Sequence, residues 1–235
     1  SRNSINEAFR VLRTNLEYIG VNDKSTPDGH SLAKVIAVTS SNPGSGKTFI
    51  SINLAKVLAI KGMRVMVLDL DIRKASLSKI TGNNETGITD FIIGRTQEDD
   101  IIKKGFDNTP GLDVICVGAL PPNPSELLSS RKLDELVGEL RTKYDYIIID
   151  CPPVEIVSDA KIINRLADMT LFVVRAGLLE KDELPNIQEY YDQNRYRNMA
   201  ILLNGTDIRS GYGYHRYGYH YGYRYGNYGA GYYGE

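Results

Sequence analysis

A glycine-rich segment that ends in Lys47 and Thr48 is the first part of this sequence that could do chemistry. It reads Ser41-Asn42-Pro43-Gly44-Ser45-Gly46-Lys47-Thr48. In a phosphate-binding loop, backbone N–H groups wrap the phosphates, the lysine reaches the β and γ oxygens, and the next hydroxyl ligates Mg²⁺. We therefore expect a nucleotide site formed by Pro43, Gly44, Ser45, Gly46, Lys47, Thr48 and Phe49. Ser41 replaces the usual first glycine, so a glycine-rich turn without a nucleotide is the alternative for this motif alone.

Three aspartates that end apolar runs could hold Mg²⁺ beside those phosphates. The run that begins at Val65 ends in Asp69 and Asp71, and the run that begins at Tyr146 ends in Asp150. Mg²⁺ prefers one or two carboxylates together with water and phosphate oxygens. A helix cap or a turn is the alternative for any one of these acids, but the three together favour a magnesium–nucleotide centre.

A third group of reactive side chains lies at the C-terminal end of the chain. The last 25 residues hold ten of the sixteen tyrosines, namely Tyr212, Tyr214, Tyr217, Tyr219, Tyr221, Tyr223, Tyr225, Tyr228, Tyr232 and Tyr233. This tail contains eight glycines and no Leu, Ile, Val or Phe, so we expect it to be disordered. Such segments also serve as adhesive low-complexity regions or stacking platforms, which is the alternative to a run of phosphate acceptors.

The composition limits the other functions that the chain could have. Its 235 residues suit one domain with a short tail, and its net charge of -1 gives no reason to expect a nucleic-acid partner. Two cysteines form no disulfide framework and favour a reducing compartment. No apolar run reaches the roughly 18 residues that a membrane-spanning helix needs.

Strand-like and helix-like runs alternate, which predicts an α/β fold with a mostly parallel sheet flanked by helices. The expected strands are Val35–Thr39, Val65–Asp69, Leu112–Val117, Tyr146–Asp150, Thr170–Val174 and Ala200–Asn204. The expected helices are Ile5–Tyr18, Thr48–Lys61, Thr86–Gly94, Ser130–Lys143, Asp159–Ala167 and Lys181–Arg195, with Gly20–Ser31 as a linker. Residues 1–210 then form one P-loop domain, with an N-terminal helix in 1–20, and 211–235 form the tail. Arg175 and Asn204 end two strands, where they could contact the nucleotide.

These residues, taken together, resemble the bacterial tyrosine kinase family of capsular and exopolysaccharide regulators. The resemblance runs from about Asn6 to the end of the chain. Its markers are the phosphate-binding loop, Asp69-Leu70-Asp71-Ile72-Arg73, Asp150-Cys151-Pro152-Pro153, Pro121-Pro122-Asn123-Pro124-Ser125-Glu126-Leu127-Leu128, Glu7-Ala8-Phe9-Arg10-Val11-Leu12-Arg13 and the tyrosine cluster.

The resemblance implies an ATP- and Mg²⁺-dependent protein tyrosine kinase. In this sequence Asp69 resembles the family's candidate base, and Asp71 and Asp150 resemble its magnesium-side carboxylates. Lys47 and these three acids are therefore the predicted catalytic residues. Thr48, Asp71 and Asp150 are the predicted metal ligands.

The resemblance also implies how copies of the chain meet. Glu7, Arg10 and Arg13 lie along one face of the N-terminal helix, because residues spaced by three are neighbours on a helix. A solvated charged stripe is the alternative, but in the family this pattern packs against the next subunit of a ring, for which an octamer is the candidate. The implied partners are a transmembrane polysaccharide co-polymerase or activator segment, fused or separate, and a tyrosine phosphatase. We expect a soluble chain at the cytoplasmic face of the bacterial inner membrane.

The predicted function is therefore a kinase that phosphorylates its own tyrosine tail in trans, within the ring, and regulates capsular or exopolysaccharide synthesis and export. The alternatives are an assembly-type P-loop ATPase and a non-enzymatic, nucleotide-dependent scaffold. Assembly ATPases usually carry a second lysine where this loop has Asn42, and they lack a tyrosine tail. The lack of His-Arg-Asp and Asp-Phe-Gly segments argues against a eukaryotic-type kinase.

Overall fold

The computed structural model describes most of the domain and none of the tail. The described residues are 2–19, 32–72, 74–82, 86–119, 124–154 and 164–206. The expected linker Gly20–Ser31 and the tail with its ten tyrosines lie outside these residues. So does most of the helix expected at Asp159–Ala167, of which residues 164–166 are described as helical.

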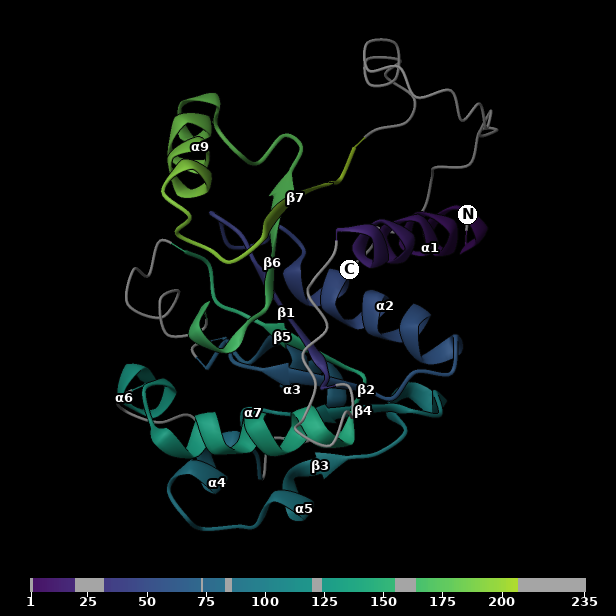
Figure 1. Ribbon diagram of the computed structural model, residues 1–235, viewed down its shortest axis with the longest axis vertical. Helices are drawn as coiled ribbons and strands as arrows, with labels where there is room; N and C mark the ends of the chain where they lie inside the picture. Colours follow the sequence, from purple (N-terminus) through teal and green to yellow (C-terminus); the bar gives the residue numbers. More distant parts are fainter. Residues whose placement is uncertain are drawn as a thin grey trace.

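A seven-stranded sheet forms the centre of the domain (Figure 1). Its strands stand in the order β3-β4-β2-β5-β1-β6-β7. Neighbouring strands are parallel except for the short β3, which runs antiparallel to β4. The strands are β1 (Lys34–Thr39), β2 (Val65–Asp69), β3 (Ile102–Lys103), β4 (Leu112–Ile115), β5 (Tyr146–Asp150), β6 (Met169–Arg175) and β7 (Met199–Asn204).

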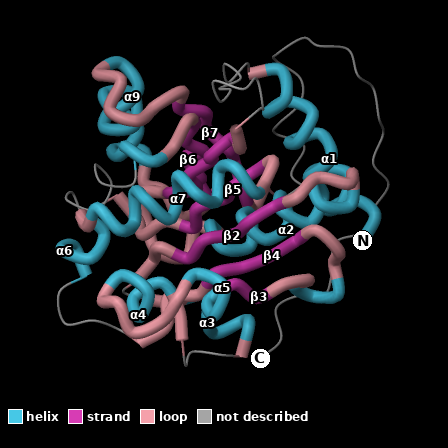
Figure 2. The backbone as a smooth tube through the Cα atoms, turned by 60° about the horizontal axis from the view of Figure 1, so that its bottom comes forward, coloured by secondary structure: helices cyan, strands magenta, loops and turns pink. Residues whose placement is uncertain are grey.

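Helices surround this sheet, which lies between them in Figure 2. They are α1 (Arg2–Tyr18), α2 (Lys47–Ile60), α3 (Ser76–Thr81), α4 (Ile88–Ile92), α5 (Glu98–Ile101), α6 (Pro124–Leu128), α7 (Arg131–Lys143) and α9 (Leu184–Asp192), with 3-10 turns η1 (Phe106–Asn108) and η2 (Lys181–Glu183). Within the described residues no helix has the length and apolar content to cross a membrane.

Two apolar layers hold the helices on opposite faces of the sheet. Successive side chains of a strand point to opposite faces, so Val35 and Ala37 of β1 pack in one cluster and Ile36 and Val38 pack in the other. The first cluster includes the buried leucines of α7, and the second includes α2 together with Phe9 of α1. The central strands are therefore buried on both faces, which explains their near-continuous Val and Ile content.

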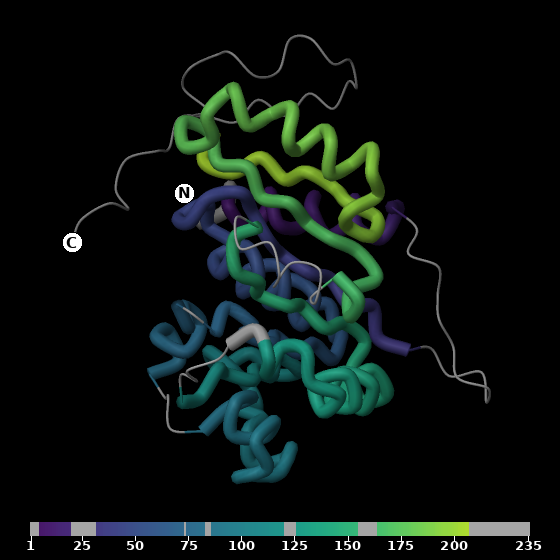
Figure 3. Tube along the Cα trace, turned by 90° about the vertical axis from the view of Figure 1, so that its left-hand side faces the viewer, coloured from purple at the N-terminus to yellow at the C-terminus, as the bar shows by residue number. Residues whose placement is uncertain are grey.

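The far end of the domain is a smaller third layer. In Figure 3 the green-to-yellow segment of α9 and β7 lies at the opposite end from the teal segment around α4 and α5. Phe172, Tyr190 and Tyr196 form an aromatic group there, with ring centroids 5.8 to 6.2 Å apart. This group fixes α9 on β6 beside the end of the sheet that β7 closes.

The predicted α/β fold with a mostly parallel sheet is confirmed, and the differences are local. The strand expected to reach Val117 ends at Ile115, because the carbonyls of Cys116 and Val117 accept the N–H groups of Ile88 and Thr89 instead of continuing the ladder. The expected helix Thr86–Gly94 is shortened to α4: these two bonds hold its start, and Gly94, with a φ of 80°, has left the helical conformation beyond its end. The expected helix Lys181–Arg195 begins as η2 and ends, as α9, at Asp192. The helices α3, α5 and α6 and the strand β3 were not predicted.

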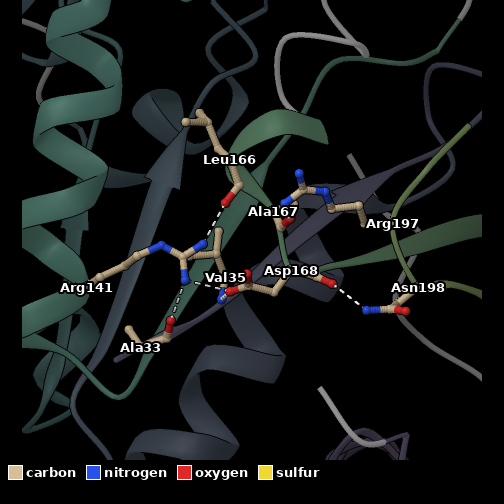
Figure 4. A network of polar contacts seen from close by, with 8 residues as sticks. All are labelled: Ala33, Val35, Arg141, Leu166, Ala167, Asp168, Arg197 and Asn198. Carbon is tan, nitrogen blue, oxygen red and sulfur yellow. Dashed lines mark hydrogen bonds and ion pairs between the residues drawn. The ribbon is translucent and has the colours of Figure 1, made fainter. Parts of the chain in front are cut away.

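A buried ion pair joins three elements at the edge of the sheet where β1 and β6 begin (Figure 4). Nη1 of Arg141, on α7, donates to Asp168 Oδ2 at 2.6 Å and to the Ala33 carbonyl at 2.8 Å, and Nη2 donates to the Leu166 carbonyl at 2.8 Å. The same Asp168 oxygen accepts the N–H of Val35 at 2.9 Å. Helix α7 is thereby fixed to the starts of β1 and β6.

We expect Asp168→Ala to destabilise the domain by about 3–5 kcal/mol, because it removes the carboxylate that neutralises the mostly buried Arg141 guanidinium and leaves the Val35 N–H without its acceptor. Urea unfolding followed by circular dichroism measures this loss. The matched control is Asp134→Ala, which breaks the exposed Arg165–Asp134 pair and should cost less than about 1 kcal/mol. Equal losses in the two variants would contradict the structural role of the Asp168 network.

Candidate active site

The phosphate-binding loop joins β1 to α2, as its sequence predicts. Gly44 and Gly46 have φ angles of 80° and 95°, which L side chains rarely adopt, so glycine is required at both positions. A Cβ at Gly46 would also lie 2.4 Å from the side-chain nitrogen of Asn204. Among the described residues, the backbone N–H groups of residues 44–48 donate to no acceptor. Donors left free at the start of a long helix fit a phosphate group.

Lys47 lies inside this loop with its ammonium group largely withdrawn from solvent. Its side chain is buried and Nζ donates to Ser40 Oγ at 3.2 Å. Burial lowers the pKa of Lys47, and the nearby Asp150 and Asp71 partly oppose that shift. A lysine held in this way is poised to contact the oxygens of a bound anion.

Asp150 stands at the end of β5, directly beside the loop. Its Oδ2 accepts the hydroxyl of Thr48 at 2.6 Å and its Oδ1 accepts that of Ser51 at 3.3 Å. Burial raises the pKa of Asp150 to about 6, against the lowering effect of Thr48 and Lys47. The structure therefore brings Thr48 and Asp150, two of the three predicted metal ligands, into direct contact.

Asp69 ends β2 and is the register partner of Asp150 on β5. It is fully buried: Oδ1 accepts the N–H of Asp71, and Oδ2 accepts both the N–H and the hydroxyl of Ser78, each at 3.2 Å. Burial, followed by the charge of Asp150, raises the pKa of Asp69 to about 8. Its role as a base stays a prediction, and its visible contacts are those of a fixed acceptor.

Asp71 lies just beyond β2, where the chain leaves the sheet. Its Oδ1 accepts the N–H of Lys74 at 3.2 Å, and its carbonyl accepts the N–H of Ala75 at 2.7 Å. This turn ends the strand at Asp69, so the turn, and not the strand alternation that would put both side chains on one face, sets the position of Asp71. All four predicted catalytic residues are buried at the ends of β1, β2 and β5.

Arg175 and Asn204, predicted to contact the nucleotide, contact the loop itself in this structure. Arg175 Nη1 donates to the Gly44 carbonyl at 2.7 Å and Asn204 Nδ2 donates to the Ser45 carbonyl at 2.8 Å. Both side chains occupy carbonyls of the loop and none of its N–H groups. Their contact with a nucleotide stays a prediction.

Other residues near the site behave differently from their sequence prediction or were missed. The side chain of Phe49 packs edge-on against Phe9 of α1, with centroids 5.8 Å apart, instead of facing the loop. Ser51 was missed although it lies three residues after Thr48 on α2 and so shares its face. Ser78 carries no sequence signal, because only the fold of α3 brings it to Asp69.

The residue set fits a magnesium–nucleotide complex better than a resident metal ion. Among the described residues, no three His, Cys, Asp or Glu side chains gather closely enough to hold a metal by themselves. Mg²⁺ needs only one or two carboxylates when phosphate oxygens and water complete its shell. Thr48, Asp71 and Asp150 would hold such an ion only together with bound phosphates.

The predicted interface residues on α1 are only partly available to a neighbour. Glu7 and Arg10 form an exposed pair, with Nη1 to Oε2 at 3.3 Å. Arg13 instead turns towards α2 and donates to the Val57 carbonyl at 3.4 Å. Arg13 therefore holds α1 on its own domain, whereas Glu7 and Arg10 can meet another copy.

Comparisons with known proteins show that the chain is similar to bacterial tyrosine-protein kinases. Residues 33–193 match the family described as AAA domain. The tyrosine-protein kinase YwqD of Bacillus subtilis is 32% identical over 89% of this chain and 85% of its own length. The tyrosine-protein kinase wzc of Salmonella typhimurium is 34% identical over 91% of this chain, which spans only 28% of that relative. The kinase domain of the Escherichia coli tyrosine kinase ETK superposes with a TM-score of 0.75 and 32% identity, covering 91% of this chain and 80% of that one.

We expect Asp69→Asn to stabilise the metal-free protein more at pH 8.5 than at pH 5.5. The folded pKa of about 8 lies above the unfolded value of about 3.9, so this acid costs stability progressively as pH rises through that interval. The neutral amide avoids that cost. Urea midpoints in EDTA at the two pH values measure the difference, and the exposed Asp99→Asn is the control. A stabilisation that is equal at both pH values would contradict the raised pKa.

Proposed function

We propose a function from one established premise: this chain belongs to the family of bacterial tyrosine-protein kinases. It is accordingly an enzyme that transfers phosphate to tyrosine. We propose that ATP is the donor and that the acceptors are Tyr212–Tyr233 of a neighbouring copy. The observation that carries this proposal is the convergence of Lys47, Thr48 and Asp150 behind a loop with free N–H groups, on a chain that also carries ten clustered tyrosines.

The loop would bind and orient the nucleotide through charge and backbone donors. Its N–H groups from Gly44 to Thr48 would surround the phosphates, and the ammonium of Lys47 would exchange its bond to Ser40 for one to a phosphate oxygen. Mg²⁺, when bound with the nucleotide by Thr48, Asp71 and Asp150, would neutralise the phosphate charge. The buried carboxylates would then lie beside a cation, whose attraction would offset the repulsion between their own charges.

Positioning of the incoming tyrosine matters more in this site than removal of its proton. A phenol has a pKa near 10, which lies above even the raised pKa of about 8 of Asp69, so Asp69 would be a weak base for it. Phosphoryl transfer depends mainly on in-line alignment and charge stabilisation. Asp69, with its three fixed hydrogen bonds, supplies a rigid acceptor towards which the hydroxyl could be aligned.

A ring of subunits would deliver each tail to the next active site. The exposed pair Glu7–Arg10 on α1 supports such a contact, and an octamer remains the candidate ring. Each added phosphate brings a charge of about -1.5 to -2 at neutral pH, so several modifications would make neighbouring tails repel. Phosphorylation would then loosen the ring that produced it.

The biological setting extends the same proposal. We propose that the kinase regulates capsular or exopolysaccharide synthesis and export at the cytoplasmic face of the inner membrane, with a membrane activator segment and a tyrosine phosphatase as partners. An apolar groove of about 430 Å³ between α1 and β7 offers a surface for an apolar partner segment. Ile201 and Leu203 at its rim are 60% and 59% exposed.

The alternative function is an assembly ATPase or a nucleotide-dependent scaffold. One structural observation weighs against the ATPase: Asn42, which replaces the second lysine of such loops, donates to Glu183 Oε1 at 3.2 Å on η2. The position is thus tied within its own subunit and presents no cation to a partner's phosphates. A scaffold would keep its assembly without transferring phosphate.

We expect incubation with ATP and Mg²⁺ to add several phosphates per chain, all within Tyr212–Tyr233, and Lys47→Met to add none. Intact mass and peptide mapping measure the additions. Mixing the Lys47→Met chain with an active chain whose tail tyrosines are changed to Phe tests transfer between copies. Phosphate on the Lys47→Met tails supports transfer in trans. Release of ADP with no phosphate on any tail would favour the ATPase.

We expect Arg10→Glu to give monomers, because Arg10 is an exposed residue of the proposed interface on α1. The monomers should still bind a fluorescent ATP analogue, because the substitution lies outside the phosphate-binding loop. Light scattering after size exclusion measures the oligomer. Arg13 is left unchanged, since it holds α1 on Val57. Arg131→Glu, which reverses another exposed arginine of a helical ion pair, is the control. An Arg10→Glu chain that stays as large as the control would rule out this interface.

A further inference from the structure

Ser78 is a buried serine that contacts the candidate base from a separate element. It lies on α3, nine residues after Asp69, and is fully buried. Its N–H and its hydroxyl both donate to Asp69 Oδ2, each at 3.2 Å. Since Oδ1 accepts the N–H of Asp71, both oxygens of the carboxylate are held by donors.

The Ser78 hydroxyl oxygen also accepts a hydrogen bond, in a third contact. The N–H of Val117, just beyond β4, donates to Ser78 Oγ at 3.0 Å. A serine hydroxyl has a single hydrogen to donate. With Val117 supplying a donor to the oxygen, that hydrogen is available for Asp69, and the hydrogen-bonded series runs from Val117 through Ser78 to Asp69.

We propose that Ser78 is a positioning residue for phosphoryl transfer, whose hydroxyl fixes the carboxylate of Asp69 relative to the end of β4. This inference rests on the proposed role of Asp69 in that reaction. Rotation of the carboxylate would break bonds to both Ser78 and Asp71, so its plane is defined by α3 and by the turn after β2. A carboxylate without the Ser78 hydroxyl keeps two of its three bonds but loses the one that links it to Val117.

A role of Ser78 in holding α3 in place can be distinguished from a role in positioning Asp69, because α3 carries a second hydroxyl that also links it to the end of β4. Thr81 Oγ1 donates to the Ser78 carbonyl at 2.9 Å and lies 3.1 Å from Cys116 Sγ, at the same end of β4. It has no contact with Asp69 among the described interactions. Thr81→Val therefore removes a tie between α3 and β4, and the donors of Ser78 to Asp69, its N–H and its hydroxyl, are unchanged.

The test compares steady-state ADP release and tail phosphorylation in the full chain. We expect Ser78→Ala to lower kcat by on the order of 10- to 100-fold, as loss of a supporting hydrogen bond does at other sites, with KM for ATP changed less than about threefold. Ser78→Thr, which keeps the hydroxyl, should recover most of kcat. Thr81→Val should keep kcat within about twofold, and thermal midpoints of all variants should be recorded alongside.

Several results would overturn the inference. They are a Ser78→Ala chain with unchanged kcat, a rise in KM that accounts for the whole loss, or an equal loss of kcat in Thr81→Val. If Ser78→Ala does not fold, Ser78→Cys has nearly the same shape with a weaker donor, and its kcat should fall between the serine and alanine values. A native chain that releases ADP without phosphorylating its tail would count against the proposed function, and Ser78 would then be judged on ADP release alone.

Discussion

The carboxylates of Asp69 and Asp150 are the constraint around which the rest of the site is arranged. Parallel pairing puts these two residues side by side at the ends of β2 and β5, and burial removes the water that would screen them. Burial raises the pKa of both acids. The charge of Asp150 adds to the rise for Asp69, and the charge of Asp71 adds to the rise for Asp150. Lys47 offsets only part of this, because its own ammonium is destabilised by the same burial. The site is consequently short of positive charge, and a cation that arrives with an anionic ligand corrects the shortage.

At the opposite ends of the strands, where β1 and β6 begin, a buried carboxylate has all its partners within the domain. There Asp168 is paired with Arg141, and the remaining donors and acceptors are backbone groups of the same domain. The polar groups at the starts of the strands are thus paired within the domain. At the ends of β1, β2 and β5, the loop N–H groups and the acids are placed to contact a ligand. Helices α7 and α2 pack on opposite faces of the same strands, so the Asp168 network at the starts of the strands and the candidate site at their ends share one sheet.

The sequence predicted those parts of the molecule whose signal is local. The alternating apolar runs located six of the seven strands, and the loop motif with Asp69 and Asp150 located the site, because each motif is a spacing along the chain. Features that depend on contacts between distant segments were not predictable in this way. Nothing in the sequence distinguishes Ser78 from other serines, because only the packing of α3 brings it to Asp69. The sequence places Arg13 in the charged stripe of the N-terminal helix, but in the structure its guanidinium donates to the Val57 carbonyl. The short β3 has two residues, too few for any period to appear.

The bond from Asn204 to the Ser45 carbonyl has a mechanical consequence. Asn204 is the last residue of β7, and the chain that continues beyond it carries the tyrosines. A displacement of the end of β7 would therefore reach the phosphate-binding loop through one side-chain bond. The last strand of the sheet and the first loop of the site are in this way mechanically coupled.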